Sequence, residues 1–192
     1  MLKLHSSIYS PQYFRAFENI EVVPTVKQAD AVLFVGGEDV TPSLYGEQRH
    51  PETHCNPARD EVEIHAYYEA KTYGKPCIGI CRGSQFLWVM MGGKLDQHVE
   101  GHIGPHIAID KKTGHLFPVT STHHQAVKGN LKDVEVLAIS EEDSLTEAYW
   151  SEKHKNLAVQ FHPEYYLNGT PPQDTRMYEL FNQWVSRFIQ EN

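Results

Sequence analysis

The chain has 192 residues, of which 40% are hydrophobic and 22% charged, and its formal net charge is −8. This composition predicts a single globular domain over residues 1–192 with a full hydrophobic core, and it excludes an extensively disordered chain. The negative charge and the lack of Lys/Arg runs argue against a nucleic-acid partner, because phosphate contacts need clustered positive charge. A small polar molecule is the better-matched substrate.

The cysteines and the apolar runs indicate the compartment. Cys55, Cys77 and Cys81 cannot all pair with one another. The sequence shows neither a secretory h-region at its start nor an apolar run of about 20 residues, so neither export nor a membrane partner is expected. The expected location is a reducing cytoplasm, and the oligomeric state stays open.

The first residues predict a strand and a helix. Residues 1–8 are expected to form a short strand, and an amphipathic stretch follows in which Tyr13, Phe14 and Phe17 share one helical face. Residues 21–24 predict a second short strand.

A buried strand and a glycine pair come next. Residues 29–35, ADAVLFV, form a continuous apolar run, as in a parallel sheet that is covered on both faces. Gly36 and Gly37 follow at the end of this strand, where open α/β folds place their sites and where glycine allows close backbone approach to a ligand. A simple turn is the alternative. The polar segment 38–47 is the expected site loop.

A helix is predicted from Ala58 to Gly74. Its first turns carry Arg59, Asp60 and Glu63. The face predicted to point to the core is formed by Val62, Ala66, Tyr67 and Ala70.

The most specific pattern in the chain surrounds Cys81. Residues 76–80 read as a buried strand and residues 84–91 as a helix, with Gly79 and Gly83 two residues either side of the cysteine. A tight turn with a glycine on each side exposes the intervening side chain above the sheet edge, as in a nucleophile elbow. An ordinary buried cysteine is the alternative, and the G-x-C-x-G pattern disfavours it.

This position also predicts chemistry. The positive end of the helix dipole and the charge of Arg82 are both expected to favour the thiolate of Cys81. The backbone N–H of Arg82 is one of the unpaired amides of a first helical turn, so it can stabilise the oxygen of an attacked carbonyl.

Three histidines follow at a spacing of four. His98, His102 and His106 could share a helical face as metal ligands, but Gly101, Gly104 and Pro105 break such a helix. No Cys, Asp or Glu is expected to complete a ligand set, so loop histidines exposed to solvent or substrate are favoured. No metal and no cofactor is expected.

The second half of the chain predicts mostly strands. A hairpin is expected from residues 107–109 and 116–119, a polar segment from 121–127, and further strands from 134–139 and 157–161. An amphipathic helix over residues 174–189 is expected to pack on the core through Met177, Leu180, Phe181, Trp184, Val185 and Phe188.

His162 and Glu164 follow the strand at 157–161. An imidazole that takes a proton from a cysteine needs an acceptor on its other nitrogen, and a carboxylate two residues along an extended backbone can point the same way. An isolated H-x-E triplet is usually a pair of solvated loop residues, so the prediction depends on Cys81 as well.

Together these residues resemble the class I glutamine amidotransferase family, over residues of roughly 30 to 165. Within it they are most similar to the γ-glutamyl hydrolase branch that cleaves γ-glutamyl-γ-aminobutyrate. The resemblance is carried by Gly36-Gly37-x-Asp39-Val40-x-Pro42, Leu44-Tyr45-Gly46-Glu47, Arg59-Asp60-x-x-Glu63, Gly79-Ile80-Cys81-Arg82-Gly83-x-Gln85, His123-His124-Gln125-Ala126 and His162-Pro163-Glu164.

The resemblance implies a fold and roles. The fold would be α/β, a flavodoxin-like, doubly wound and mostly parallel sheet with a small antiparallel side sheet. Cys81 would be the nucleophile, His162 the general base and acid, and Glu164 its orienting partner. The amides of Gly37 and Arg82 would form the oxyanion hole. The substrate-binding residues would be Gly36, Gln85, His124 and Gln125.

Three functions remain open at this level. The favoured one is a free-standing hydrolase of γ-glutamyl amides that forms a γ-glutamyl thioester on Cys81. A glutaminase that passes ammonia to a separate synthetase or ligase is the alternative. An inactive binding module is disfavoured because Cys81, His162 and Glu164 are all present.

Overall fold

The computed structural model describes residues 1–167 and 175–192, and its centre is a 9-stranded mixed β-sheet. The strands lie in the order β2 (Ile20–Val22), β1 (Leu2–His5), β3 (Ala31–Phe34), β4 (Cys77–Ile80), β11 (Asn156–Val159), β10 (Thr146–Ser151), β9 (Glu135–Ser140), β6 (Ile103–Asp110) and β7 (Leu116–Thr122). From β2 to β11 neighbouring strands run parallel, and from β11 to β7 they run antiparallel.

A small antiparallel sheet stands apart from the large one. It pairs β5 (Lys94–Asp96) with β8 (Ala126–Lys128), with Leu95 opposite Val127. Both strands pack beside α2 (Arg82–Met90). The predicted α/β class, with a sheet that is parallel at its centre and a small antiparallel side sheet, is thereby confirmed.

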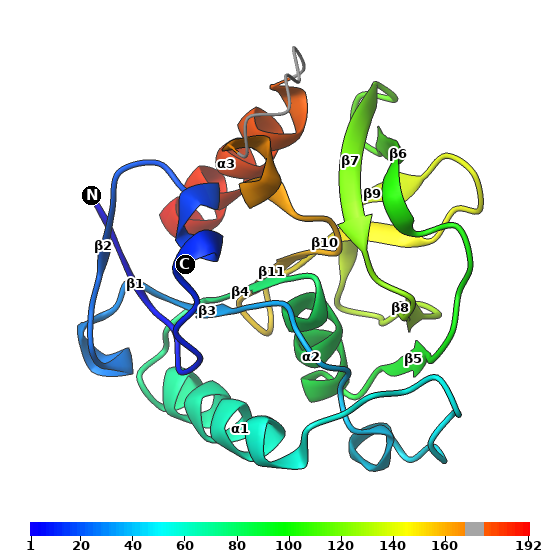
Figure 1. Ribbon diagram of the computed structural model, residues 1–192. Coiled ribbons are helices and arrows are strands. Elements are labelled where there is room, and N and C mark those ends of the chain that lie inside the picture. The colour runs from blue at the N-terminus through cyan, green and yellow to red at the C-terminus, as the bar shows by residue number, and fades with distance from the viewer. Residues whose placement is uncertain (168–174) are drawn as a thin grey trace.

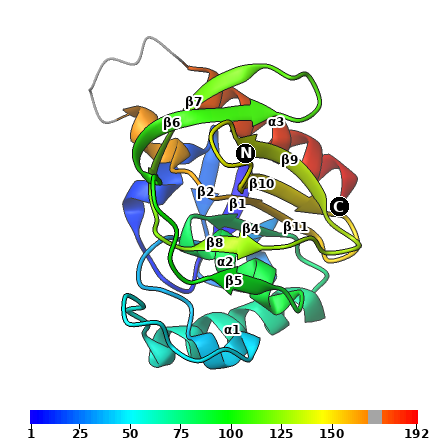
Figure 2. The ribbon, with the colours of Figure 1, turned by 90° about the vertical axis from the view of Figure 1, so that its right-hand side faces the viewer.

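The helices cover the sheet from opposite faces, as Figures 1 and 2 show. α1 (Pro57–Thr72) and α2 lie on one face, and α3 (Arg176–Glu191) lies on the other with the short 3-10 helix η1 (Pro11–Ala16). Each face has its own hydrophobic core, with Phe86 and Trp88 in one and Phe181 and Phe188 in the other. Burial of apolar side chains in these two cores stabilises the fold by about 25 cal/mol per Å² of apolar surface.

The central parallel strands end together, and this positions the site. Val159 is the register partner of Ile80, and Phe34 is the partner of Gly79. The segments after β3, β4 and β11 therefore leave the sheet at one edge, the carboxyl edge where open α/β folds bind ligands. Gly36, Cys81 and His162 belong to these three segments.

Helix α1 begins where the sequence predicts, but it buries a different face. The Asn56 side chain accepts a hydrogen bond from the Arg59 amide at 3.3 Å, and Pro57 occupies the first turn, a combination that favours helix initiation. Ala66, Tyr67 and Ala70 are buried as predicted, whereas Val62 is 47% exposed. The charged residues of the first turns, Arg59, Asp60 and Glu63, are buried instead. Asp60 and Glu63 pair with Arg82, and Arg59 pairs with Glu38 and Glu63.

Other elements also differ from their sequence prediction. The predicted first helix is the short 3-10 helix η1, in which Tyr13 and Phe14 are still buried. The hairpin β6–β7 is longer than predicted, and β10 was not predicted at all. The start of the last predicted helix, at Asp174, lies outside the described residues, and the four buried side chains on α3 are Met177, Phe181, Val185 and Phe188, all among those predicted.

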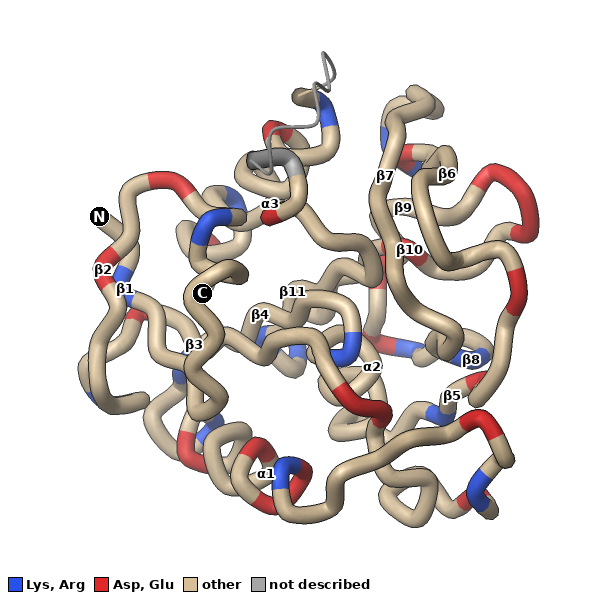
Figure 3. Tube along the Cα trace, viewed as in Figure 1, with Lys and Arg blue, Asp and Glu red and all other residues tan. Residues whose placement is uncertain are grey.

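The remaining elements are short 3-10 helices: η2 (Val26–Gln28), η3 (Pro42–Tyr45) and η4 (Pro163–Leu167). Figure 3 shows Lys and Arg positions spread along the trace and interspersed with Asp and Glu. Within residues 1–167 and 175–192, no helix is long and apolar enough to cross a membrane.

Candidate active site

Cys81 lies in the turn between β4 and α2 with a strained backbone. Its φ of 54° and ψ of −113° lie outside the regions that a side chain ordinarily allows, at a cost of about 1–3 kcal/mol. The turn is held by hydrogen bonds from the Cys81 amide to the carbonyl of Val159 at 2.9 Å and from the Ser84 amide to the Cys81 carbonyl at 2.9 Å. This is the geometry of the predicted nucleophile elbow.

The two glycines beside Cys81 are required by space. A Cβ on Gly83 would lie 2.0 Å from the carbonyl oxygen of Phe34, and a Cβ on Gly79 would lie 2.6 Å from the carbonyl oxygen of Gly83. Backbone atoms cannot yield by that amount, so no other residue fits at either position. The G-x-C-x-G pattern is therefore a packing requirement of the elbow.

His162 and Glu164 form a buried pair next to the cysteine. The distance from His162 Nδ1 to Glu164 Oε1 is 2.7 Å, and the His162 amide donates to the carbonyl of Thr120 at 2.9 Å. Burial alone would lower the pKa of His162, but hydrogen bonds with Cys81 and Glu164, and their negative charge, raise it to about 10. The structure thus brings together the cysteine, the histidine and the glutamate that the sequence singled out.

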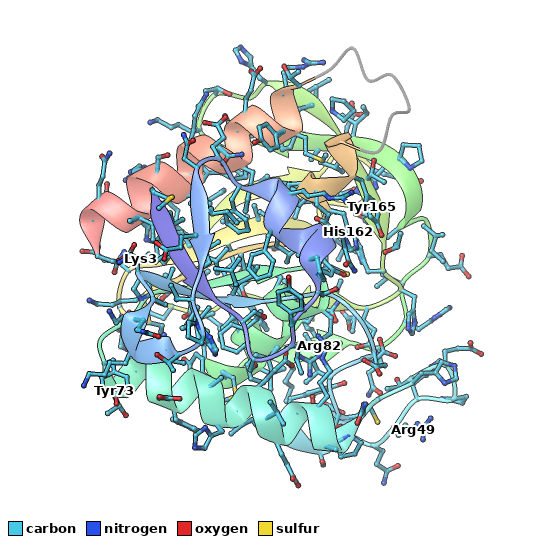
Figure 4. All side chains as sticks on the ribbon, turned by 60° about the vertical axis from the view of Figure 1, so that its left-hand side comes forward. Lys3, Arg49, Tyr73, Arg82, His162 and Tyr165 are labelled. Carbon is cyan, nitrogen blue, oxygen red and sulfur yellow. The ribbon has the colours of Figure 1, made fainter. Side chains whose placement is uncertain are left out.

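Three further side chains surround His162. Thr122 Oγ1 lies 2.9 Å from His162 Nε2, and the Tyr165 ring stacks on the imidazole with centroids 4.6 Å apart and an interplanar angle of 11°. Figure 4 shows His162 and Tyr165 side by side. The Tyr13 ring lies 6.0 Å away. None of these three was identified from the sequence as a site residue. Only Tyr165 could have been identified, because it directly follows the His162-Pro163-Glu164 triplet.

The Gly36–Gly37 segment is held by the guanidinium of Arg59. Nη2 of Arg59 donates to the carbonyls of Val35 and Gly36, each at 2.9 Å, while Nη1 pairs with Glu38 at 2.9 Å. A Cβ on Gly37, whose φ is 136°, would lie 2.0 Å from Arg59 Nη1. A Cβ on Gly36 would lie 3.4 Å from the Cβ of Cys81, so this segment passes directly beside the elbow.

The side chain of Arg82 has a different role from the one expected. Its guanidinium pairs with the buried carboxylates of Asp60 and Glu63, and its Nε donates to the carbonyl of Glu38 at 3.1 Å. In Figure 4 it lies between His162 and α1. Its charge is therefore neutralised by α1, which corrects the expectation that it acts on the thiol of Cys81.

A cavity of about 210 Å³ opens in front of the elbow. Of the predicted site residues, those that line it are Cys81, Gly37, Arg82, Gln85, His124 and Gln125. Gly36, His162 and Glu164 do not line it, whereas Thr122, which contacts His162 Nε2, does. The cavity is smaller than the roughly 300–1,000 Å³ of drug-sized pockets, which favours a small ligand.

Hydrogen bonds order the polar part of the cavity wall. Gln85 Nε2 donates to the carbonyl of Gln125 at 2.9 Å, and Gln125 Nε2 donates to Thr53 Oγ1 at 3.2 Å. His124 Nε2 lies 3.2 Å from Asp39 Oδ2. A larger cavity of about 540 Å³, between α3 and the β6–β7 hairpin, contains none of the predicted site residues.

The three histidines spaced by four do not share one environment. His98 is exposed, whereas His102 is buried and the side chain of His106 is 10% exposed. The last two contact Glu147 of β10. The helix is absent, as predicted, but His106 belongs to a strand, and an acidic residue distant in sequence does join the pair.

Comparisons with known proteins agree with this geometry. A family model described as Peptidase C26 matches residues 15–115 and 102–164. The putative glutamine amidotransferase-like protein YvdE of Lactococcus lactis is 32% identical over 185 residues, covering 85% of this chain and 77% of that protein. The carbamoyl phosphate synthase small chain of Aquifex aeolicus is 36% identical over 117 residues, covering 58% of this chain and 29% of that protein.

The fold has solved counterparts as well. The crystal structure of a glutamine amidotransferase from Thermotoga maritima has a TM-score of 0.62 with this chain, at 14% identity. The match covers 99% of this chain and 95% of that one, so the likeness extends over the whole fold.

Proposed function

Since this chain belongs to the peptidase C26 family of class I glutamine amidotransferases and is an enzyme of the amidotransferase and hydrolase kind, we propose that it hydrolyses γ-glutamyl amides through a thioester on Cys81. The observation that carries this proposal is the placement of Cys81, on its strained elbow, near His162, whose Nδ1 is bound by Glu164. This is the arrangement that nucleophilic acyl transfer requires.

The residues divide the reaction between them. Cys81 Sγ, as thiolate, attacks the δ-carbonyl carbon, and the carbonyl electrons move onto oxygen. When they return, the C–N bond breaks, and the amine leaves with a proton from His162. A water then gives a proton to His162 and attacks the thioester, which releases glutamate and regenerates Cys81. Glu164 keeps His162 oriented through both steps.

The oxyanion formed in each step would be held by the amides of Gly37 and Arg82. In a trans peptide the C=O and the following N–H point to opposite sides. The carbonyl of Gly36 points to Arg59, so the amide of Gly37 points away from Arg59. Arg82 is the first residue of α2, where the amide has no partner within the helix. Gly37, Arg82 and Cys81 line the same cavity, which supports this assignment.

The cavity also suits the amino-acid end of a γ-glutamyl group. Backbone hydrogen bonding and the contact with Arg59 lower the pKa of Glu38 to about 2, so a carboxylate, partly balanced by Arg59, lines the cavity. This charge can bind the α-ammonium group of the substrate. Gln85, His124 and Gln125, on the opposite wall, are the proposed contacts for the rest of the glutamyl group, with Gly36 beside the nucleophile.

The direct test is turnover by the purified chain with no other protein present. Glutamate release is measured from glutamine and from γ-glutamyl-γ-aminobutyrate, with Cys81→Ala as the matched inactive control. Release by the wild type and not by the variant supports the hydrolase. Hydrolysis that persists in Cys81→Ala contradicts the assigned nucleophile.

A second candidate is a glutaminase that supplies ammonia to a separate synthetase. It is favoured by the similarity to a protein named as the small chain of carbamoyl phosphate synthase. A glutaminase of this kind needs its oxyanion hole only when the partner is bound, since free ammonia would otherwise be lost. If neither substrate is hydrolysed although Cys81 is alkylated readily, the partner-dependent glutaminase replaces the hydrolase.

A further inference from the structure

Three side chains from different parts of the chain converge beside the active-site wall. His102 Nδ1 lies 3.5 Å from Glu147 Oε1, and His106 Nε2 lies 2.9 Å from the same oxygen. One nitrogen of each histidine and one carboxylate oxygen all lie within 4.8 Å of one another. Ligand atoms around a tetrahedral Zn²⁺, bound at about 2.0–2.1 Å, are separated by about 3.3 Å. The distances from Glu147 Oε1 to His106 Nε2 and His102 Nδ1, 2.9 Å and 3.5 Å, lie on either side of that value.

The backbone explains this convergence. β6 pairs with β9 only from Ala108 onward, so the start of β6 extends beyond the end of β9. β10 has a register shift between Thr146 and Ala148, which is where Glu147 stands. Bulges of this kind redirect a side chain and occur often beside functional sites. Glu147 can therefore meet residues of a strand that is not its neighbour in the sheet.

The orientation of His102 matches that of a metal ligand. Its Nε2–H donates a hydrogen bond to Asp143 Oδ2 at 2.9 Å, and Nδ1 is the nitrogen that faces Glu147. Metal-bound histidines are commonly held in this way by a carboxylate on the other ring nitrogen. Glu147 and Asp143 together carry two negative charges, which would balance a divalent cation.

The cluster also has unused polar atoms. Among the described residues, His102 Nδ1 and Glu147 Oε2 are buried with no hydrogen-bond partner. The same holds for Nε2 of His123, whose ring centroid lies 4.8 Å from that of His102. The Nδ1 atom of His123 is engaged with the carbonyl of Gln125 at 2.9 Å, which fixes Nε2 as its free nitrogen. Buried polar atoms without partners are rare and costly, and a bound ion would satisfy them.

We propose that His102, His106 and Glu147 form a divalent-metal site, best matched to Zn²⁺, with the fourth position open to His123 or water. Two imidazoles and one carboxylate are a ligand set of catalytic zinc sites, whereas Mg²⁺ and Ca²⁺ prefer oxygen ligands alone. His123 also lines the Cys81 cavity. A metal here would fix the segment from Thr122 to Gln125, which forms one wall of that cavity.

Metal binding by the whole protein tests the proposal without any activity assay. Protein stripped with a chelator is dialysed against Zn²⁺ or Co²⁺ and the bound metal is measured. About one equivalent is expected, and the Co²⁺ form should show intense visible absorption of four-coordinate cobalt without a sulfur-to-cobalt band. Binding should persist after the cysteines are alkylated.

Matched variants locate the site. His106→Ala and Glu147→Gln should weaken Co²⁺ affinity by about 100-fold or more. Asp143→Asn should weaken it by about 10- to 100-fold, as loss of an outer carboxylate does. The side chain of Asp143 is 37% exposed, and asparagine can still accept from the Leu145 amide, so this variant is expected to fold.

His98→Ala is the control, because His98 belongs to the same sequence run and stacks on His50 with ring centroids 5.6 Å apart. Its affinity should equal that of the wild type. The proposal is overturned if the wild type binds neither ion, if cobalt shows a sulfur band, or if His98→Ala weakens binding as much as His106→Ala.

Discussion

Two histidine–glutamate pairs in this chain have nearly the same contact distance. His162 Nδ1 lies 2.7 Å from Glu164, and His106 Nε2 lies 2.9 Å from Glu147. Both carboxylates are almost fully buried. Neither the distance nor the burial therefore distinguishes the pair proposed for catalysis from the pair proposed for metal binding.

The difference lies in what the free side of each imidazole meets. His162 contacts Cys81, a nucleophile on a strained turn, beside a cavity of about 210 Å³. His106 meets the ring of His102 at a centroid distance of 4.9 Å, and His102 meets His123. A histidine that is oriented by a carboxylate can transfer a proton when a thiol lies next to it. When other ligand atoms lie next to it instead, the same histidine can bind a cation.

The surroundings also shift the pKa values of the histidines in the proposed metal site. The nearby carboxylate of Glu147 raises the pKa of His102 to about 9 despite burial, with Asp143 adding to the effect. Burial lowers the pKa of His123 to about 4. The pKa values of His102 and His123 thus differ widely, because two carboxylates lie next to His102, whereas burial dominates at His123.

The largest effect is expected for His162→Ala. Loss of the residue that moves the proton should lower kcat by roughly 10⁴-fold or more, as losses of triad members do. The measurement is glutamate release from the hydrolysed substrate at saturating concentration. His115→Ala, which removes an exposed histidine of the β6–β7 hairpin, is the control and should keep the wild-type rate. A wild-type rate in His162→Ala would place the base elsewhere.

Glu164→Gln should have a smaller effect. The imidazole remains and can still accept a proton, but its orientation and the stabilisation of its charged form are weakened, so kcat should fall by roughly 10²- to 10⁴-fold. KM should change little, because Glu164 does not line the cavity. If KM rises while kcat is retained, Glu164 contributes to substrate binding and not to the orientation of His162.

The two pairs also show how much of a site can be predicted from sequence. His162 and Glu164 stand two residues apart after a strand, so local backbone direction alone predicts their contact. Glu147 follows His106 by 41 residues and meets it only because β10 carries a bulge. Spacing within one segment indicates nothing about such a contact.

The same limit explains the errors in α1. Periodicity correctly identified the helix, but it assigned Val62 to the core, where the structure buries Arg59, Asp60 and Glu63. A charged residue reads as solvent-facing in a single sequence. Arg82, positioned by the β4–α2 turn, pairs with both carboxylates, and Arg59 also pairs with Glu63, so these contacts offset the cost of burial.

Alkylation tests whether His162, unlike His106, acts on a neighbouring thiol. At neutral pH, iodoacetamide should label Cys81 faster than Cys55 or Cys77, because the imidazolium of His162 favours the thiolate. Cys77 is fully buried, and burial raises its pKa. In His162→Ala the labelling of Cys81 should slow by about tenfold or more, as measured by mass spectrometry of the peptides. Preferential labelling of Cys55 or Cys77 in the wild type contradicts the elbow assignment.

The smallest expected effect is a displacement of the pH profile. The His162 proton goes to the leaving amine, so the rate should fall as the pH rises through the pKa of His162, which is raised to about 10. The charge of Glu164 contributes to this rise, so its removal in Glu164→Gln lowers the pKa. The alkaline limb of kcat against pH should therefore move to lower pH, by roughly 1 to 3 units.

The matched control for this displacement is Glu191→Gln, the same substitution at an exposed glutamate that pairs with Arg187. Exposed ion pairs of this kind contribute little, so its alkaline limb should coincide with that of the wild type. If Glu164→Gln keeps the wild-type limb while kcat falls, Glu164 orients the imidazole without stabilising its charge. The catalytic pair would then differ from the His102 group in electrostatics as well as in its neighbours, because the pKa of His102 depends mainly on its carboxylate partners.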